Sequence, residues 1–446
     1  MIPHPPLVVP GVGKGEEIPN TRRAIEKIAA EIKQQNPETV VIISPHSVCY
    51  SDYFHIAPGI RTEGDFGRFG VKHIKFSVDY DQEFAQTISK IAAVKGLSAG
   101  FLGEREPALD HGVTVPLYFI KHKNIVRISV SGLSVLDHYR LGMCIAEAGK
   151  QLERNFVIIA SGDMSHSLNS DAPGGFTKEG AEFDNLVRRC VESGDWQKLM
   201  QINPEFIENA AECGYRSLVM LVGAFEGQSI KSNVLNYEGP YGVGYLTASF
   251  ESGGKIESLL QQLINNREQT IKQIRSQESD YVRLARQSVE CFVCSGELLT
   301  VPTDLPQQLL TSRAGVFVSI KKDGNLRGCI GTTSPTESSL ATEIIQNSVS
   351  ACSRDTRFEP VEKEELPNLV YSVDVLFPPE LIKNKSQLDV NRYGVIVRSG
   401  RRSGLLLPAL SGVNTVDEQL GIALRKAGIG PDEPYQVERF EVVRHQ

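Results

Sequence analysis

The chain has 446 residues, too many for one ordinary hydrophobic core, so we expect two or more domains. Hydrophobic residues make up 41% and charged residues 23%, as in a soluble globular protein, and the net charge of −7 gives no general case for binding nucleic acid. No apolar run approaches membrane-spanning length, and the N-terminus lacks a basic segment followed by an apolar one. We therefore expect a cytoplasmic protein without a membrane partner.

The first 250 residues alternate amphipathic helical patterns with short runs of β-branched residues. Such runs are typical of strands that are buried on both faces, as in a parallel sheet. The predicted helices are 22–35, 81–93, 136–154, 176–193, 196–202, 204–208 and 215–225. The predicted strands are 39–43, 124–130, 156–160 and 233–237, and the segment 241–250 closes this half. The alternation predicts a three-layer α/β domain with a largely parallel central sheet.

The second half has a different pattern. A serine and two glycines at 252–254 are the first sign of a linker, and a polar amphipathic helix is expected over 256–276. We place the first domain at 1–251, a helical linker at 252–278 and a second domain at 279–446. Its predicted helices are 281–296, 338–352 and 415–427, and its predicted strands are 315–321, 371–376 and 394–398. This mixture predicts a smaller α+β domain.

Four of the nine histidines lie in turns rich in proline or glycine: His4, His46, His111 and His166. His46 and His166 each follow the end of a predicted buried strand, where ligands bind in open α/β sheets. Imidazole is the commonest metal ligand and the commonest acid or base near neutral pH. For His46 alone, a structural histidine in a turn is as good an interpretation, but the recurrence of the pattern favours a functional site.

A carboxylate is needed beside two histidines to form the facial set that suits Fe(II) and dioxygen chemistry. Glu238 is the strongest candidate, because it ends a short predicted strand and precedes Gly-Pro, so it is not a surface charge in the middle of a helix. The alternative is an ordinary carboxylate in a surface turn. Asp110 and Asp163 are placed to orient His111 and His166 as outer partners.

These residues resemble the class III extradiol dioxygenases, the LigB-like superfamily, and the related Memo proteins. The matching segments are His4-Pro5-Pro6, Ser44-Pro45-His46, Leu109-Asp110-His111-Gly112, the turn from Ser161 to His166, and the glycine- and tyrosine-rich end at 237–245. The resemblance implies Fe(II), with Zn, Mn or Cu as alternatives, held by His4, His46 and Glu238. It also implies that His166 is the catalytic acid and base and that His111 helps to bind substrate or dioxygen.

The resemblance implies a metal-dependent oxidoreductase acting on a small aromatic or other small-molecule substrate with dioxygen. In the extradiol mechanism, the ring is opened beside two hydroxyls. The alternative is a Memo-like metal-binding or redox accessory without ring cleavage. Memo proteins carry a cysteine where the dioxygenases carry the glutamate, so Glu238 favours the dioxygenases.

Residues 279–446 resemble the AMMECR family, whose reaction is not established. The matching motifs are Leu326-Arg327-Gly328-Cys329-Ile330-Gly331, the segment from Ser348 to Phe358, Gly404-Leu405-Leu406-Leu407-Pro408 and Lys426-Ala427-Gly428-Ile429. We expect Arg327, Cys329, Asp355 and Arg357 to line a pocket for an anion or a planar polar group. A structural turn with both arginines in ion pairs is an equal alternative. Both families occur with a radical-SAM protein in a three-part bacterial and archaeal system, which makes such a protein an expected partner. A homo-oligomer is a further alternative.

Overall fold

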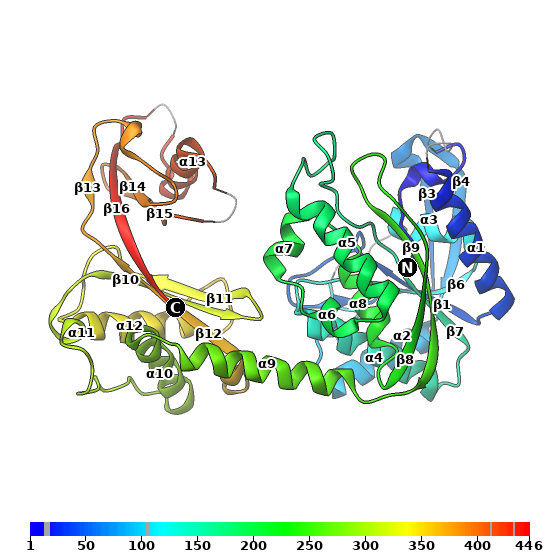
Figure 1. Ribbon diagram of the computed structural model, residues 1–446, viewed down its shortest axis with the longest axis horizontal. Coiled ribbons are helices and arrows are strands. Elements are labelled where there is room, and N and C mark those ends of the chain that lie inside the picture. Colours follow the sequence, from blue (N-terminus) through cyan, green and yellow to red (C-terminus); the bar gives the residue numbers. More distant parts are fainter. Residues whose placement is uncertain (13–17, 104–107, 411–412, 431–432) are drawn as a thin grey trace. The chain divides into compact units, whose positions relative to one another are not determined.

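The computed structural model describes residues 1–12, 18–103, 108–410, 413–430 and 433–446 (Figure 1). The chain forms two compact units, Met1–Ile264 and Asn265–Gln446. The segment predicted as a linker contains the end of strand β9 (Tyr245–Lys255) and all of helix α9 (Leu259–Ser276). No helix within the described ranges combines the length and the apolar character that a membrane crossing requires.

A five-stranded sheet forms the centre of the N-terminal unit, with the strands in the order β3-β4-β6-β1-β7. Their bounds are β3 (Arg61–Phe66), β4 (Val71–Tyr80), β6 (Asn124–Ser129), β1 (Thr39–Ser44) and β7 (Phe156–Ala160). Strand β1 pairs in parallel with both β6 and β7, and β4 pairs in parallel with β6. Only the β3–β4 hairpin within this sheet is antiparallel. The predicted largely parallel sheet is thus confirmed.

Helices cover both faces of this sheet: α1 (Pro19–Gln35), α2 (Gln82–Val94), α3 (His111–Ile120) and α4 (Val135–Gln151). Successive side chains of β1 point to opposite faces, as the pleat requires. Val40 and Ile42 join a core with α1 and α3, whereas Val41 and Ile43 join a core with α2 and α4. All four side chains are fully buried, which explains why the strand is a continuous apolar run and confirms the three-layer arrangement.

The rest of the N-terminal unit consists of short helices and strands, a helical segment and a two-stranded pair. It contains η1 (Pro6–Val8), β2 (Phe54–His55), η2 (Gly67–Phe69), β5 (Ala99–Gly100), α5 (Lys178–Ser193), α6 (Trp196–Met200), α7 (Pro204–Asn209), α8 (Tyr215–Gly223) and β8 (Gln228–Glu238). Strands β8 and β9 form an antiparallel pair whose apolar side chains share a core with α5 and α8. The β3–β4 hairpin was not predicted, because its alternating polar residues contain no apolar run.

The C-terminal unit is built on an antiparallel sheet with the order β11-β10-β12-β16-β14-β15, and β13 also pairs with β16. The strands are β10 (Gly315–Lys322), β11 (Asn325–Gly331), β12 (Leu369–Leu376), β13 (Glu380–Leu381), β14 (Tyr393–Ser399), β15 (Arg402–Leu406) and β16 (Gln436–His445). Its helices are α10 (Asp280–Ser295), α11 (Gln307–Thr311), η3 (Lys363–Asn368), α12 (Leu340–Ser353), η4 (Lys385–Gln387) and α13 (Val416–Ala427). Helices α10 and α12 share the main core with β10 and β12, which confirms the α+β prediction.

Candidate metal centre

The carboxyl ends of β1 and β7 bring distant parts of the N-terminal unit together. Because the two strands are parallel neighbours, the turns after them lie at the same edge of the sheet. The first residues of the chain run beside the end of β7: the Ile2 amide donates to the Ala160 carbonyl over 3.0 Å, and the Gly162 amide donates to the Ile2 carbonyl over 3.2 Å. This pairing places His4 at the same edge as His46.

Three of the predicted histidines meet at this edge. The Nε2 atoms of His4 and His46 lie 3.0 Å apart, and the rings of His46 and His111 are stacked with their centroids 4.1 Å apart. One nitrogen from each of His4, His46 and His111 lies within 4.8 Å of the others, a grouping that could hold a metal ion. His4 is only 1% exposed, so the cluster begins in the protein interior and reaches outward through the other two rings.

The tautomer of His4 is fixed by a buried serine. Ser161 Oγ lies 2.6 Å from the Gly112 carbonyl oxygen, to which its hydroxyl must donate, and 2.9 Å from His4 Nδ1. Since the hydroxyl hydrogen is committed to Gly112, Ser161 accepts the proton that His4 carries on Nδ1. Nε2 of His4 is therefore left as a lone pair that faces the cluster, which is the form in which imidazole binds a metal.

Two further side chains approach His4 from the other side. Cys213 Sγ lies 3.6 Å from His4 Nε2, and Asp163 Oδ2 lies 3.9 Å from the same nitrogen. His4, Asp163 and Cys213 form a second grouping that could hold an ion. Asp163 Oδ1 also accepts the backbone N–H of His4 over 2.8 Å.

Cys213 was not predicted as a site residue. The only feature of the sequence near Cys213 that indicates a site is the glycine-containing turn between two helices. The cysteine of the Memo proteins was a further reason to search for a cysteine ligand. The turn approaches the one after β7 so closely that a Cβ on Gly162 would lie 2.1 Å from Gly214 Cα. Glycine at both positions therefore allows the contact that places Cys213 beside His4.

Glu238 lies elsewhere, and its predicted place in the cluster needs correction. Its Oε1 accepts hydrogen bonds from the backbone N–H of Thr21 over 2.7 Å and from the Thr21 hydroxyl over 2.6 Å. Its Oε2 accepts from Asn20 Nδ2 over 3.3 Å. These groups belong to the first turn of α1, where backbone N–H groups lack helical partners and attract a negative charge. The structure thus brings His111, and not Glu238, beside His4 and His46.

The cluster favours neutral imidazoles. Burial lowers the pKa of His4 well below its ordinary value, and the neighbouring His46 and His111 lower it further. Burial, followed by the charge of His46, lowers the pKa of His111 to about 4, and burial also lowers the pKa of His46. Burial raises the pKa of Asp163 to about 7 and the pKa of the Cys213 thiol well above its usual range. Near neutral pH the histidines therefore present lone pairs and not charges.

The two predicted orienting carboxylates hold backbone turns in place. Asp110 accepts hydrogen bonds from the hydroxyls of Ser44 and Ser47, each over 2.6 Å. These serines flank His46, so Asp110 fixes the His46 turn while it directly precedes His111. Asp163 holds the backbone of His4, and no hydrogen bond or ion pair joins its side chain to His166 within the described ranges.

His166 lies near the cluster without joining either grouping. Its turn follows β7 and so lies at the same edge of the sheet as His46. Burial lowers the pKa of both His4 and His46, and the charge of His166 lowers them further. Its backbone N–H donates to the Ala210 and Ala211 carbonyls, and its Nδ1 is buried with no hydrogen-bond partner among the described residues. A buried ring nitrogen without a partner, in a turn at the same edge of the sheet as a potential metal site, is suited to proton transfer.

A pocket of about 690 Å³ opens beside His46 and His111. Its opposite wall comes from the β3–β4 hairpin and the short helix η2 between the two strands. The cluster is therefore accessible to a small molecule from this side, whereas His4, Asp163 and Cys213 do not line this pocket.

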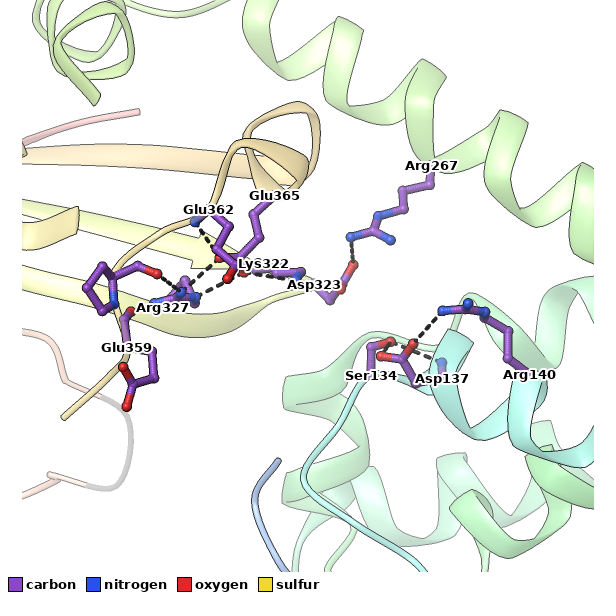
Figure 2. A network of polar contacts seen from close by, with 11 residues as sticks. Ser134, Asp137, Arg140, Arg267, Lys322, Asp323, Arg327, Glu359, Glu362 and Glu365 are labelled. Atoms are coloured by element: carbon purple, nitrogen blue, oxygen red, sulfur yellow. Dashed lines mark hydrogen bonds and ion pairs between the residues drawn. The ribbon is translucent and has the colours of Figure 1, made fainter. Parts of the chain in front are cut away.

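The four residues singled out in the C-terminal unit are largely engaged with one another and with neighbours. Arg327 and Lys322 both point to the Glu365 carboxylate, with Arg327 forming two hydrogen bonds of 3.0 and 2.8 Å (Figure 2). Arg357 likewise forms a paired contact with Asp355, whose Oδ2 also accepts the Cys329 N–H over 2.9 Å. These contacts match the second interpretation of the sequence, a structural turn in which both arginines form ion pairs.

Comparison with known proteins agrees with the two-part architecture. Residues 1–248 match the family described as the catalytic LigB subunit of aromatic ring-opening dioxygenase, and residues 282–445 match the AMMECR1 family. Protein CA_C1420 of Clostridium acetobutylicum is 39% identical over 100% of this chain and 98% of its own length. A Thermotoga maritima protein is 46% identical over 38% of this chain and 98% of its own length.

Two solved structures are similar to parts of the chain. The uncharacterized protein PH0010 from Pyrococcus horikoshii is 36% identical, covers 37% of this chain and 88% of its own, and gives a TM-score of 0.35. The uncharacterized protein JW3007 from Escherichia coli K12 is 16% identical, covers 51% of this chain and 91% of its own, and gives a TM-score of 0.34. On the family matches, which confirm the predicted fusion, the chain belongs to the family of the catalytic LigB subunit of aromatic ring-opening dioxygenases through its first 248 residues and continues into an AMMECR1 domain.

Proposed function

We propose that the N-terminal unit is a metal-dependent oxidoreductase of the extradiol dioxygenase type, acting on a small molecule that enters the pocket beside His46 and His111. The observation that carries this proposal is the fixed tautomer of His4, which directs an unprotonated Nε2 at His46 from 3.0 Å. Two imidazoles that favour the neutral form, one buried and one exposed, face each other at a distance that suits a shared cation.

The donor set fits a metal ion. His4 and His46 would hold it, with His111 available on the pocket side and Asp163 or Cys213 on the inner side. Fe(II) is the first candidate and Zn, Mn or Cu are the alternatives, because imidazole, carboxylate and thiolate donors suit all of them. When bound, Fe(II) would supply a redox-active centre at which an electron-rich substrate and dioxygen can react.

In this proposal the protein's own residues position the substrate and move protons. His166 would take a proton from a substrate hydroxyl and return it later, because its ring lies beside the cluster but belongs to neither ion-holding grouping. His111 would contact the substrate or dioxygen at the mouth of the pocket. The deep placement of His4 would keep bulk water from that side of the reaction.

A second candidate function is a Memo-like metal-binding or redox accessory that works with a radical-SAM protein and does not cleave rings. The observation that favours it is Cys213 Sγ beside His4, together with the use of Glu238 at the start of α1. A thiol in place of a carboxylate favours softer ions such as Cu(I) or Zn(II). In that case the pocket would receive the product or a reactive group of the partner enzyme.

Anaerobic Fe(II) loading followed by dioxygen uptake with catechol separates the two candidates. The wild-type chain should bind about one ion and consume dioxygen with catechol, while His46→Ala should lose the metal and the uptake. His73→Ala is the matched control, since His73 is an exposed histidine of β4 outside the cluster. Metal binding without uptake would support the accessory role, and a wild-type chain that binds no metal would contradict both proposals.

A further inference from the structure

A groove of about 230 Å³ runs between the free edges of β7 and β9, and none of the clustered histidines lines it. Consecutive residues of both strands border this groove, 156–159 on β7 and 248–251 on β9. Successive side chains of a strand point to opposite faces, so neighbouring residues border one cavity only where the backbone edge of the strand faces it. The groove is therefore bounded by two strand edges and not by the face of a sheet.

Backbone groups of alternate residues point from these edges into the groove. In β7, the Asn155 carbonyl and the Ser161 N–H bond toward β1, so the odd-numbered residues face β1, while Phe156 and Ile158 face the groove. In β9, Ala248 pairs with Met1 and not with β8, so Phe250, two residues later, also faces the groove. Within the described ranges, no hydrogen bond joins the outward N–H and C=O groups of residues 156, 158 and 250 to another segment.

The segment Met1–Ile2 shows what fits between the two edges. On one side, the Ile2 N–H donates to the Ala160 carbonyl over 3.0 Å. On the other side, the Ala248 N–H donates to the Met1 carbonyl over 3.2 Å, and the Met1 amino group donates to the Ala248 carbonyl over 2.9 Å. A strand that pairs on both sides spaces its neighbours about 10 Å apart. At this end β7 and β9 therefore lie one strand apart, and the groove continues along their edges.

Apolar side chains of two helices cover both faces of the groove. Ile28 and Ile32 of α1 belong to the core on one face of the sheet, whereas Leu221 and Phe225 of α8 belong to a core on the other. A strand between β7 and β9 would thus be covered on both faces and should be apolar on both, as β1 is. The first three residues of β7 are only half-buried although all three are apolar, and such a strand would complete their burial.

We propose that this groove is a docking site for an extended, apolar segment of a partner protein, which adds as a strand between β7 and β9. A peptide backbone offers donors and acceptors to two strand edges at once, at the repeat that both edges share. An apolar small molecule would cover the helices but leave the backbone groups of both edges unpaired. The site is separate from the proposed reaction and does not depend on it.

Fluorescence anisotropy of a labelled peptide tests the proposal on the full chain. The probe is acetyl-Lys-Val-Ala-Val-Ala-Val-Lys-amide with fluorescein on one lysine, in which small apolar residues suit both faces and the lysines give solubility. The control peptide has the same side chains but carries N-methyl groups on its three valines, which block the backbone hydrogen bonds toward one strand edge. Loss of these bonds should weaken binding by about tenfold or more.

Hydrogen–deuterium exchange locates the bound probe. The N–H groups of Ile158 and Phe250 face the groove and should exchange about tenfold more slowly with the probe, whereas the Val157 N–H in the β1 ladder should not change. Ala224→Phe places a ring in the groove and should weaken the binding of the probe by about tenfold or more. Ala93→Phe, at an exposed alanine of α2 outside the groove, is the matched control and should bind the probe like the wild type.

The outcomes distinguish strand addition from other uses of the groove. Equal binding of the probe and its N-methylated form would show that apolar contact alone fills the groove and would overturn the proposal. Failure of the wild-type chain to bind the probe, or protection away from β7 and β9, would overturn it as well. Protection of the same N–H groups when the chain alone is concentrated would assign the groove to a second copy and overturn the separate partner. If circular dichroism shows that Ala224→Phe unfolds, the N-methylated peptide and the exchange data still decide the question.

Discussion

His4 Nε2 and His46 Nε2 lie 3.0 Å apart, although 42 residues separate them in the chain. Because Ser161 holds the only proton of neutral His4 on Nδ1, this contact needs either a proton on His46 Nε2 or a cation between the rings. A shared ion would replace a single hydrogen bond by two metal–ligand bonds. Metal binding and protonation of His46 Nε2 therefore compete at this contact.

Ser161→Ala should weaken metal binding while the histidine cluster stays assembled. The change removes the acceptor that holds the His4 tautomer and leaves the Gly112 carbonyl without its donor, so we expect a loss of about tenfold to a hundredfold in metal affinity. Competition with a chelator of known affinity would measure it. Ser217→Ala is the control, because Ser217 is equally buried and its hydroxyl has no partner in the described ranges. Equal affinities of the two variants would show that the serine does not set the tautomer.

Glu238→Gln should lower stability and leave the metal in place. Loss of the negative charge at the first turn of α1 should reduce the free energy of unfolding by about 1 kcal/mol, the usual contribution of such a contact. Urea unfolding followed by the fluorescence of Trp196, the single tryptophan, reports on this unit. The exposed Glu251→Gln on β9 should change neither the stability nor the metal content. A Glu238→Gln protein that purifies without metal would restore Glu238 as a ligand.

His166→Ala should separate turnover from metal binding. A general base beside the ion, but outside its ligand set, can be removed without loss of the ion, and turnover should fall by about a hundredfold or more if proton transfer is limiting. Metal content and the rate of catechol oxidation would be measured on the same preparation. His73→Ala, which changes an exposed histidine of β4 outside the cluster, serves as the control. A His166→Ala chain without metal would make His166 a ligand, and unchanged turnover would make its turn purely structural.

Glu365→Gln should alter the acid sensitivity of the C-terminal unit. Burial raises the pKa of Glu365, but the hydrogen bonds from Arg327 and Lys322 outweigh it and lower the pKa from 4.5 to about 2. A lowered pKa means that this carboxylate stabilises the fold above pH 4.5, and that the contribution is lost as the pH falls toward 2. Between these values the variant should lose less stability on acidification than the wild type.

Circular dichroism during urea unfolding at several pH values would measure the difference in stability between Glu365→Gln and the wild type. Trp196 fluorescence should show the same unfolding of the N-terminal unit in both proteins. The exposed Glu364→Gln is the matched control for the loss of one carboxylate. Parallel pH profiles for the wild type and Glu365→Gln would show that the ion pairs of Glu365 with Arg327 and Lys322 (Figure 2) do not stabilise the folded unit.

Local sequence patterns were sufficient to predict the layers of the first unit and two of its site turns. A run such as Val40 to Ile43 is long enough to fill both faces of a strand, and the turn after it must lie at the edge of the sheet. The positions of His46 and His166 followed from that argument. The β3–β4 hairpin, which forms a wall of the pocket, was not predicted, because a polar hairpin is stabilised by pairing with a sheet whose presence its own residues do not reveal.

The sequence by itself thus determined which side chains end the strands, since that depends on the periodicity of a few consecutive residues. Only the tertiary structure decided which distant groups join them. Cys213 reaches His4 because two glycine turns approach closely, whereas Glu238 is held by the unpaired N–H groups at the start of α1. Both outcomes depend on contacts between segments about 200 residues apart. A carboxylate binds the nearest unsatisfied donors, and a motif match does not reveal which donors will be nearest in the folded chain.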